Sequence, residues 1–159
     1  MSLLLEAGTA VPHDRSMNPS APDIRADRAS RLATLRRHAA VSEAAAARRL
    51  EARRAEAWRF ARETGTSLRR DYGATRVLVF GSLATGHFGH WSDVDVLAYG
   101  VPPSLRLAAE ADLSTEPRRR GDLSIDVVTA EDVSPAIVAE AERYGIVIFD
   151  STELGLSSA

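Results

Sequence analysis

The residues best suited to chemistry are two aspartates, Asp93 and Asp95, in the segment DVDVLA. Acidic and aliphatic residues alternate over the first four positions of this segment, and two apolar residues follow. This pattern predicts a β-strand over residues 93–98. Side chains two residues apart on a strand point to the same face, so both carboxylates are expected to lie together. Two neighbouring negative charges repel each other unless a cation lies between them, and Mg²⁺ prefers carboxylate oxygens. The pair therefore predicts a metal site.

A Gly81-Ser82 pair follows an earlier apolar strand, predicted over residues 76–80. Glycine lets a backbone approach a phosphate closely, and the residues after Ser82 can begin a helical turn with free amide groups. The serine hydroxyl adds a hydrogen-bond donor. Trp91 is expected to pack the loop that leads to the aspartates. An anion-binding turn beside a cation-binding pair of acids predicts a site for a metal-bound nucleotide.

The order of these features resembles a known family. Gly81-Ser82, followed after ten residues by Asp93-Val94-Asp95, is similar to the signature of the DNA polymerase β-type nucleotidyltransferases, specifically the minimal nucleotidyltransferase (MNT) group. That superfamily uses a third carboxylate on a later strand, and Asp126 in LSIDVVT matches it. The resemblance covers residues 72–150. It implies an α/β fold of the α+β type, with a small mixed sheet of about four strands and flanking helices.

The same resemblance implies an activity and a set of roles. Members transfer a nucleoside monophosphate, here AMP from ATP, to a hydroxyl group and release pyrophosphate. Asp93 and Asp95 would bridge two Mg²⁺ ions, and Asp126 would complete the ion on the acceptor side and assist deprotonation. Gly81 and Ser82 would hold the β- and γ-phosphates. MNT proteins of this kind act as antitoxins that adenylylate a tyrosine of a HEPN-type toxin, which implies a protein partner.

The acceptor remains open between three hypotheses: protein adenylylation in a toxin–antitoxin pair, nucleotidyl transfer to a small molecule such as an antibiotic, and a non-catalytic antitoxin that only binds. Aminoglycoside-type relatives typically add a C-terminal helical domain, whereas only about ten residues follow Phe149 here. This favours the first hypothesis over the second. A pure binder has no need of clustered carboxylates, which favours catalysis over the third.

The amino-acid composition restricts the kinds of site and the cellular location that are expected. The 159 residues include no cysteine and no lysine, so all 20 basic residues are arginine. Disulfides and thiolate metal sites are excluded, and a reducing cytoplasm is the expected location. The leucines at residues 3–5 are too short a run for a signal peptide or a membrane span. The net charge of −2 hides an asymmetry: residues 25–70 hold 13 arginines and 5 acids, whereas residues 71–159 hold 6 arginines and 14 acids.

Four regions are predicted along the chain. Residues 1–22 are rich in proline and polar residues and are expected to be a disordered extension, with Met17 as an alternative start. Residues 23–71 form an Ala/Arg-rich helical arm, residues 72–150 the nucleotidyltransferase core, and residues 151–159 a polar tail.

The arm is predicted as two helices, over residues 23–40 and 42–72, with Ser42 as the N-cap of the second. Apolar residues at helical spacing predict a stripe that packs against the sheet, made of Trp58, Ala61, Leu68 and Tyr72. The many arginines of the arm allow several hypotheses for its function. It could bind nucleic acid or an acidic protein, mediate self-association, or be a solvated helix that packs on its own domain. Nucleic acid is the least favoured partner.

Overall fold

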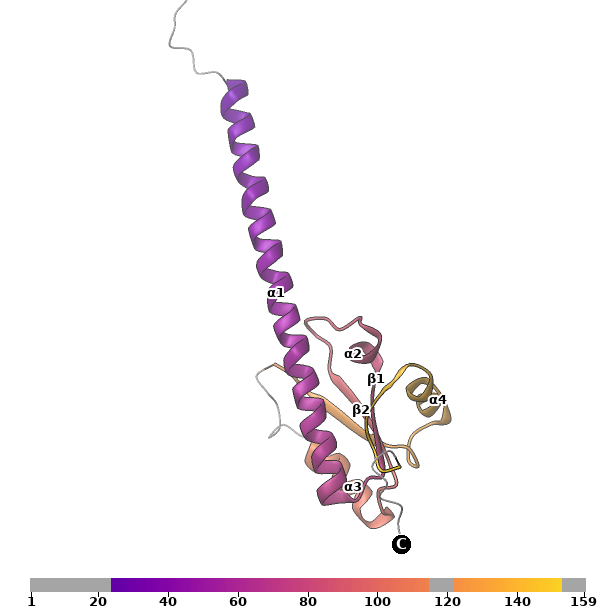
Figure 1. Ribbon diagram of the computed structural model, residues 1–159. Coiled ribbons are helices and arrows are strands. Elements are labelled where there is room, and N and C mark those ends of the chain that lie inside the picture. The colour runs from indigo at the N-terminus through magenta and orange to yellow at the C-terminus, as the bar shows by residue number, and fades with distance from the viewer. Residues whose placement is uncertain (1–23, 115–121, 153–159) are drawn as a thin grey trace, which may run out of the picture. The chain divides into compact units, whose positions relative to one another are not determined.

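The computed structural model describes residues 24–114 and 122–152 (Figure 1). The predicted extension over residues 1–22 and most of the predicted tail lie outside the described residues. The described residues form, in order, α1 (Ile24–Tyr72), β1 (Arg76–Phe80), α2 (Gly81–Thr85), β2 (Val94–Tyr99), α3 (Pro103–Ser114), β3 (Ile125–Thr129), α4 (Pro135–Tyr144) and β4 (Ile146–Asp150). The chain divides into two compact units between Ser42 and Glu43.

The four strands form one mixed sheet with the order β3-β2-β1-β4. β1 is antiparallel to both β2 and β4, and β2 is parallel to β3. In the central pair, Val77 lies opposite Ala98 and Phe80 lies opposite Asp95. The predicted small mixed sheet with flanking helices is thus confirmed. Both central strands are aliphatic over most of their length because both faces of the sheet are covered.

One face of the sheet packs against α1 and α3. Buried side chains from these elements belong to a single hydrophobic cluster, including Ala57, Phe60, Ala61 and Leu68 of α1, Val77, Val79, Val94, Val96, Ile125 and Val127 of the strands, and Ala109 and Leu113 of α3. Trp58 and Tyr72 are partly buried against the same cluster. The predicted stripe along α1 is therefore confirmed, and the C-terminal part of this helix is a layer of the core.

The prediction of a helix break at Ser42 is wrong. α1 runs from Ile24 to Tyr72 as one helix of 49 residues. The residues around Ser42 are mostly alanine, glutamate and arginine, which are strong helix formers, and no glycine or proline occurs between Pro22 and Gly65. Ending a helix leaves several backbone groups without hydrogen-bond partners. This costs more free energy than keeping one serine, a weaker helix former, inside a continuous helix. No described helix has an apolar stretch long enough to cross a membrane.

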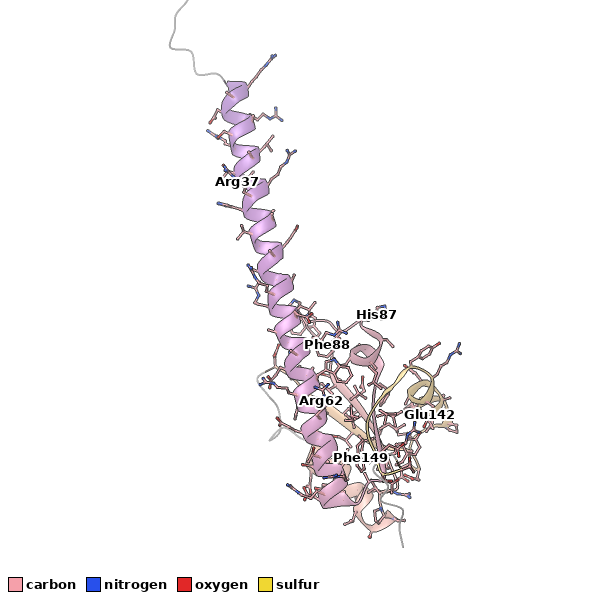
Figure 2. The ribbon with its side chains drawn as sticks, viewed as in Figure 1. Arg37, Arg62, His87, Phe88, Glu142 and Phe149 are labelled. Carbon is pink, nitrogen blue, oxygen red and sulfur yellow. The ribbon has the colours of Figure 1, made fainter. Side chains whose placement is uncertain are left out.

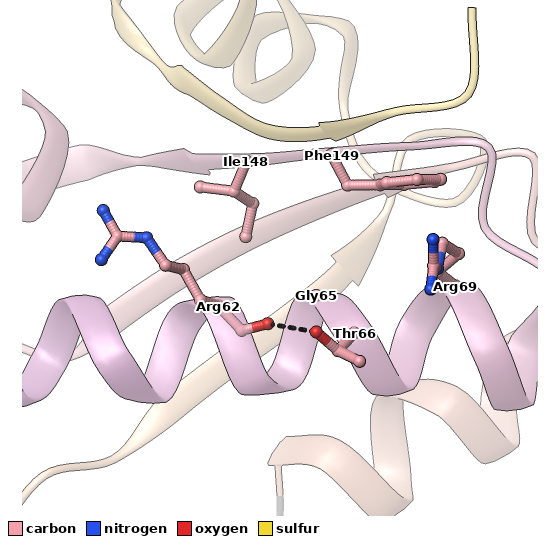
Figure 3. Close-up of a pocket in the computed structure, with 6 residues that line it drawn as sticks. All are labelled: Arg62, Gly65, Thr66, Arg69, Ile148 and Phe149. Atoms are coloured by element: carbon pink, nitrogen blue, oxygen red, sulfur yellow. Dashed lines mark hydrogen bonds between the residues drawn. The ribbon is translucent and has the colours of Figure 1, made fainter. Parts of the chain in front are cut away.

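The compact unit that contains the sheet begins at Glu43, whereas the sequence places the start of the core at Tyr72. Two glycines explain how the helix joins the sheet. A Cβ on Gly65 would lie 2.8 Å from the Ile148 Cδ1 atom, so α1 and β4 are in close contact at this glycine (Figure 3). Gly73 has φ of 72° and ends the helix, while the Ala74 amide donates to the Leu68 carbonyl at 3.0 Å.

α4 is anchored to the other face of the sheet. Arg76 of β1 donates to the Glu142 carboxylate at 2.6 Å, and the Tyr99 hydroxyl of β2 donates to the same Oε1 atom at 2.6 Å (Figure 2). These bonds lower the pKa of Glu142, with the Tyr99 bond as the largest cause. Arg76 and Tyr99 alternate with Val77 and Ala98, so α4 covers the face that does not contact α1.

We expect Leu68→Ala to lower the free energy of unfolding by roughly 2–5 kcal/mol, because the side chain is fully buried and its removal leaves a cavity. Leu35→Ala on the same helix is the matched control, since that side chain is 63% exposed and its loss should change stability by less than about 0.5 kcal/mol. Urea unfolding of the full chain measures both. Equal effects would contradict the assignment of this part of α1 to the core.

Candidate active site

The structure places two of the predicted acids directly opposite each other. Asp95 on β2 is the register partner of Asp126 on the parallel strand β3, and Phe80 at the end of β1 lies on the other side of Asp95. Because side chains alternate along strands, both carboxylates lie on the face that carries α4. Asp95 is half-buried and Asp126 is exposed.

Asp93 lies just before β2, which begins at Val94 rather than at the predicted residue 93. Its exposed carboxylate accepts a hydrogen bond from the Ser124 hydroxyl. The Val94 amide donates to the Ser124 carbonyl at 3.0 Å, so the segments that lead into β2 and β3 are joined at this point. Asp93 is therefore held beside Asp95 and turned toward Ser124.

Other acidic side chains lie around Asp95. The pKa of Asp95 is raised to about 6, mainly by burial, and the negative charges of Asp126, Asp93 and Glu140 contribute to the same rise in decreasing order. Glu140 belongs to α4 (Pro135–Tyr144) and is exposed. Sequence reasoning missed Glu140, because no local pattern marks an acid on a helix that reaches the strands only after the chain has folded.

Gly81 lies against Asp95. It has φ of 65°, which is in the left-handed region, and it opens α2 directly after β1. A Cβ atom at this position would overlap the Asp95 carboxylate, with the Cγ atom only 3.2 Å away. Glycine is thus required for its backbone conformation and for the space that it leaves to the acid. Ser82 follows it and is half-buried, so the predicted glycine–serine turn adjoins the acids.

The prediction that Trp91 packs the loop before β2 is wrong. The indole is 95% exposed, whereas Phe88 is only 5% exposed and belongs to the hydrophobic cluster. Phe88 is the aromatic side chain by which this loop packs into the core (Figure 2). The Trp91 side chain is consequently left at the surface, close in sequence to Asp93.

A family model described as a nucleotidyltransferase domain matches residues 62–148, which is more than half of the chain. The chain belongs to this family. The matched residues include β1, the glycine–serine turn and all three predicted acids. No curated protein has a sequence that matches the chain significantly.

Several solved structures share part of this nucleotidyltransferase fold. A toxin–antitoxin complex with AMP-PNP has a TM-score of 0.45 and 18% identity, over 58% of this chain and 75% of that one. The MntA–HepT toxin–antitoxin complex has a TM-score of 0.41 and 15% identity, over 60% and 74%. A tri-AMPylated Shewanella oneidensis HEPN toxin in complex with an MNT antitoxin has a TM-score of 0.41 and 15% identity, over 61% and 76%. Because these likenesses are partial, the membership of the chain in the nucleotidyltransferase family rests on the family model alone.

The acids of this nucleotidyltransferase fit a magnesium ion as a pair. Among residues 24–114 and 122–152, no three acidic or histidine side chains are gathered so that they could hold one ion. Mg²⁺ is usually held by one or two carboxylates, with water and substrate phosphate as the other ligands. Asp95 and Asp126 meet that requirement, and a cation between them would offset both the burial of the Asp95 carboxylate and its repulsion by Asp126, which together raise the pKa of Asp95. Asp93 would join them after release from Ser124.

We expect Asp95→Asn to stabilise the folded protein above pH 6. The folded-state pKa of about 6 exceeds the ordinary value of 3.8, so the stability that protonated Asp95 provides is complete below about pH 4 and is lost as the pH rises through about 6. Since the side chain is partly exposed, we expect a difference of about 1 kcal/mol between wild type and variant at pH 8 that disappears near pH 4. Urea unfolding across this range without metal measures it. A difference independent of pH would contradict the raised pKa.

Gly81→Ala and Gly86→Ala form a matched pair. Both glycines have positive φ, 65° and 82°, so each alanine should lower stability by about 1 kcal/mol. Only an alanine at 81 displaces the Asp95 carboxylate, because nothing lies within 4 Å of a Cβ at Gly86. We therefore expect the Mg²⁺-induced rise in melting temperature to be lost in Gly81→Ala and kept in Gly86→Ala. The same loss in both would show that backbone strain alone is responsible.

Proposed function

We propose that this nucleotidyltransferase transfers AMP from ATP, with Mg²⁺, to a hydroxyl group of a partner protein. As the partner we propose a HEPN-type toxin, for which this chain would be the MNT-type antitoxin. The observation that carries the proposal is the register pairing of Asp95 with Asp126 beside Gly81, inside the region that the nucleotidyltransferase family model matches.

The described residues divide the work as follows. Asp95 and Asp126 would hold the metal, and Asp93 would complete the set once its carboxylate leaves Ser124. The chemistry that Mg²⁺ would supply when bound is positive charge beside the acceptor oxygen and the leaving phosphates. Gly81 and Ser82 bind the β- and γ-phosphates, since this turn adjoins Asp95 and glycine leaves the backbone accessible.

In the proposed reaction, the acceptor hydroxyl oxygen forms a bond to the α-phosphorus. The bond from the α-phosphorus to the bridging oxygen breaks, and pyrophosphate leaves with that electron pair. The hydroxyl proton passes to a carboxylate at the site, a role that we assign to Asp126 because it is exposed and lies opposite Asp95. Catalysis of this kind depends mainly on positioning and charge stabilisation, which clustered carboxylates and a phosphate-binding turn provide.

Exposure supports a large acceptor. Asp93 and Asp126 are both exposed, so a hydroxyl carried on the surface of another protein can reach them. The choice of a toxin tyrosine rests on the resemblance of the Gly81-Ser82 and Asp93-Val94-Asp95 pattern to the MNT group. A transfer that labels a small molecule instead, or neutralisation of the toxin without any transfer, would replace this part of the proposal.

We expect the double variant Asp95→Asn/Asp126→Asn to lose at least about 100-fold in the rate of AMP transfer, because the charges that stabilise the reaction are removed. Full-length protein is incubated with α-³²P-labelled ATP, Mg²⁺ and the product of the neighbouring open reading frame, and labelled protein is measured on gels. Asp71→Asn is the control, since it removes one carboxylate charge from an exposed ion pair with Arg70 and leaves Asp95 and Asp126 in place. Transfer by the double variant at the wild-type rate would overturn the catalytic role of these acids.

A further inference from the structure

Arg53 on α1 is a buried charge in the unit that contains the sheet. Its side chain is only 8% exposed, although arginine is normally a surface residue. A buried guanidinium is strongly destabilising unless its donors are paired. Arg53 also lies outside residues 62–148, the part of the chain that the nucleotidyltransferase family model matches. Its contacts therefore show what the helix contributes to the domain beyond the family's common core.

One set of contacts holds the loop before β2. The Arg53 Nη2 atom donates to the Ser92 carbonyl at 3.1 Å, and the Nε atom donates to the Gly89 carbonyl at 3.4 Å. The guanidinium lies over the Phe88 ring, 5.6 Å from its centroid. Ser92 directly precedes Asp93 in the sequence, so this side chain restrains the backbone from which the first acid projects.

A second set of contacts holds the segment before β3. The Arg53 Nη1 atom pairs with the Asp122 Oδ1 atom at 2.5 Å, and Nη2 also donates to the Asp122 carbonyl at 3.4 Å. Asp122 precedes Asp126 by four residues. A single guanidinium thus reaches the starts of both parallel strands, which are far apart in the chain.

We propose that Arg53 is a positioning residue that keeps the acids in register by tying the start of β2 to the start of β3. This inference rests on the proposed function, because it assigns Arg53 to the geometry of Asp93, Asp95 and Asp126. Only arginine suits the position: its planar fork presents several donors in fixed directions, whereas lysine has one compact ammonium group. Without the tie, the two segments keep the backbone bond from Val94 to Ser124 but lose their common anchor on α1.

The first test needs neither metal nor activity. Amide hydrogen exchange of the full chain is compared between wild type, Arg53→Lys and the exposed control Arg49→Lys. We expect exchange to rise about tenfold in peptides covering residues 89–95 and 122–126 of Arg53→Lys, with β4 (Ile146–Asp150) and the control unchanged. Faster exchange in only one of the two segments, or in neither, would overturn the proposal.

The second test measures Mn²⁺ affinity, by electron paramagnetic resonance of the free ion, in the same proteins. Loss of a residue that orients metal ligands typically weakens binding 10- to 100-fold, so we expect about a tenfold rise in Kd for Arg53→Lys. A purely structural role would lower the melting temperature and leave the Kd unchanged, which would overturn the proposal.

Asp122→Asn is a second variant in case Arg53→Lys does not fold, because the Asp122 side chain is 77% exposed. It weakens one side of the same tie, and we expect a smaller rise in the Mn²⁺ Kd, of roughly threefold, with faster exchange over residues 122–126. An unchanged Kd and unchanged exchange in Asp122→Asn would overturn the proposal. Wild-type protein that binds no Mn²⁺ would instead contradict the proposed function, and the exchange experiment would still decide the role of Arg53.

Discussion

The parallel pairing of β2 with β3 is the constraint on which the site depends. It places Asp95 opposite Asp126 and brings two carboxylates together on one face of the sheet. The ionised form of Asp95 is disfavoured there, first by burial and then by the negative charge of Asp126, and both raise its pKa. The rest of the domain holds the strands in this register with a hydrophobic cluster on the opposite face. The fold thus keeps a half-buried carboxylate close to other acids, and strongly shifted pKa values of this kind are typical of functional sites.

The helix α1 has two different roles along its length. From Glu43 onward it belongs to the compact unit of the sheet, where Ala61 and Leu68 are buried and Arg53 reaches the segments that lead to the acids. From Arg25 to Ser42 every residue is exposed, and the arginines there face solvent. The Ala/Arg-rich composition is similar in both parts, so composition alone does not separate core from arm. Burial against the sheet separates them, because an amphipathic stripe is useful only where a partner surface exists.

Small residues decide how closely the elements approach. Gly81 leaves room for the Asp95 carboxylate, and Gly65 lies in close contact with Ile148 of β4. At both positions any side chain would meet an atom of a neighbouring element that is distant in the sequence. The first contact joins the proposed nucleotide-binding turn to the acids. The second joins the helix to the edge of the sheet. A domain of this size can therefore assemble a site from short strands and one short helix, provided that these approaches are kept.

Alternation, turn chemistry and motif spacing are local signals, so the strand pattern, the glycine–serine turn and the three candidate aspartates could be predicted from the sequence. The same signals predicted a mixed sheet of about four strands and the apolar stripe of α1. The continuation of α1 through Ser42 also follows from local helix propensity, although Ser42 resembles an N-cap. The folded structure was needed to show that Phe88 rather than Trp91 packs into the core, and that Arg53 and Glu140 adjoin the candidate site. These features depend on contacts between segments 30 or more residues apart, such as Arg53 with Ser92, which is 39 residues away. No local pattern encodes which buried charge meets which loop, since that follows from the packing of the whole domain.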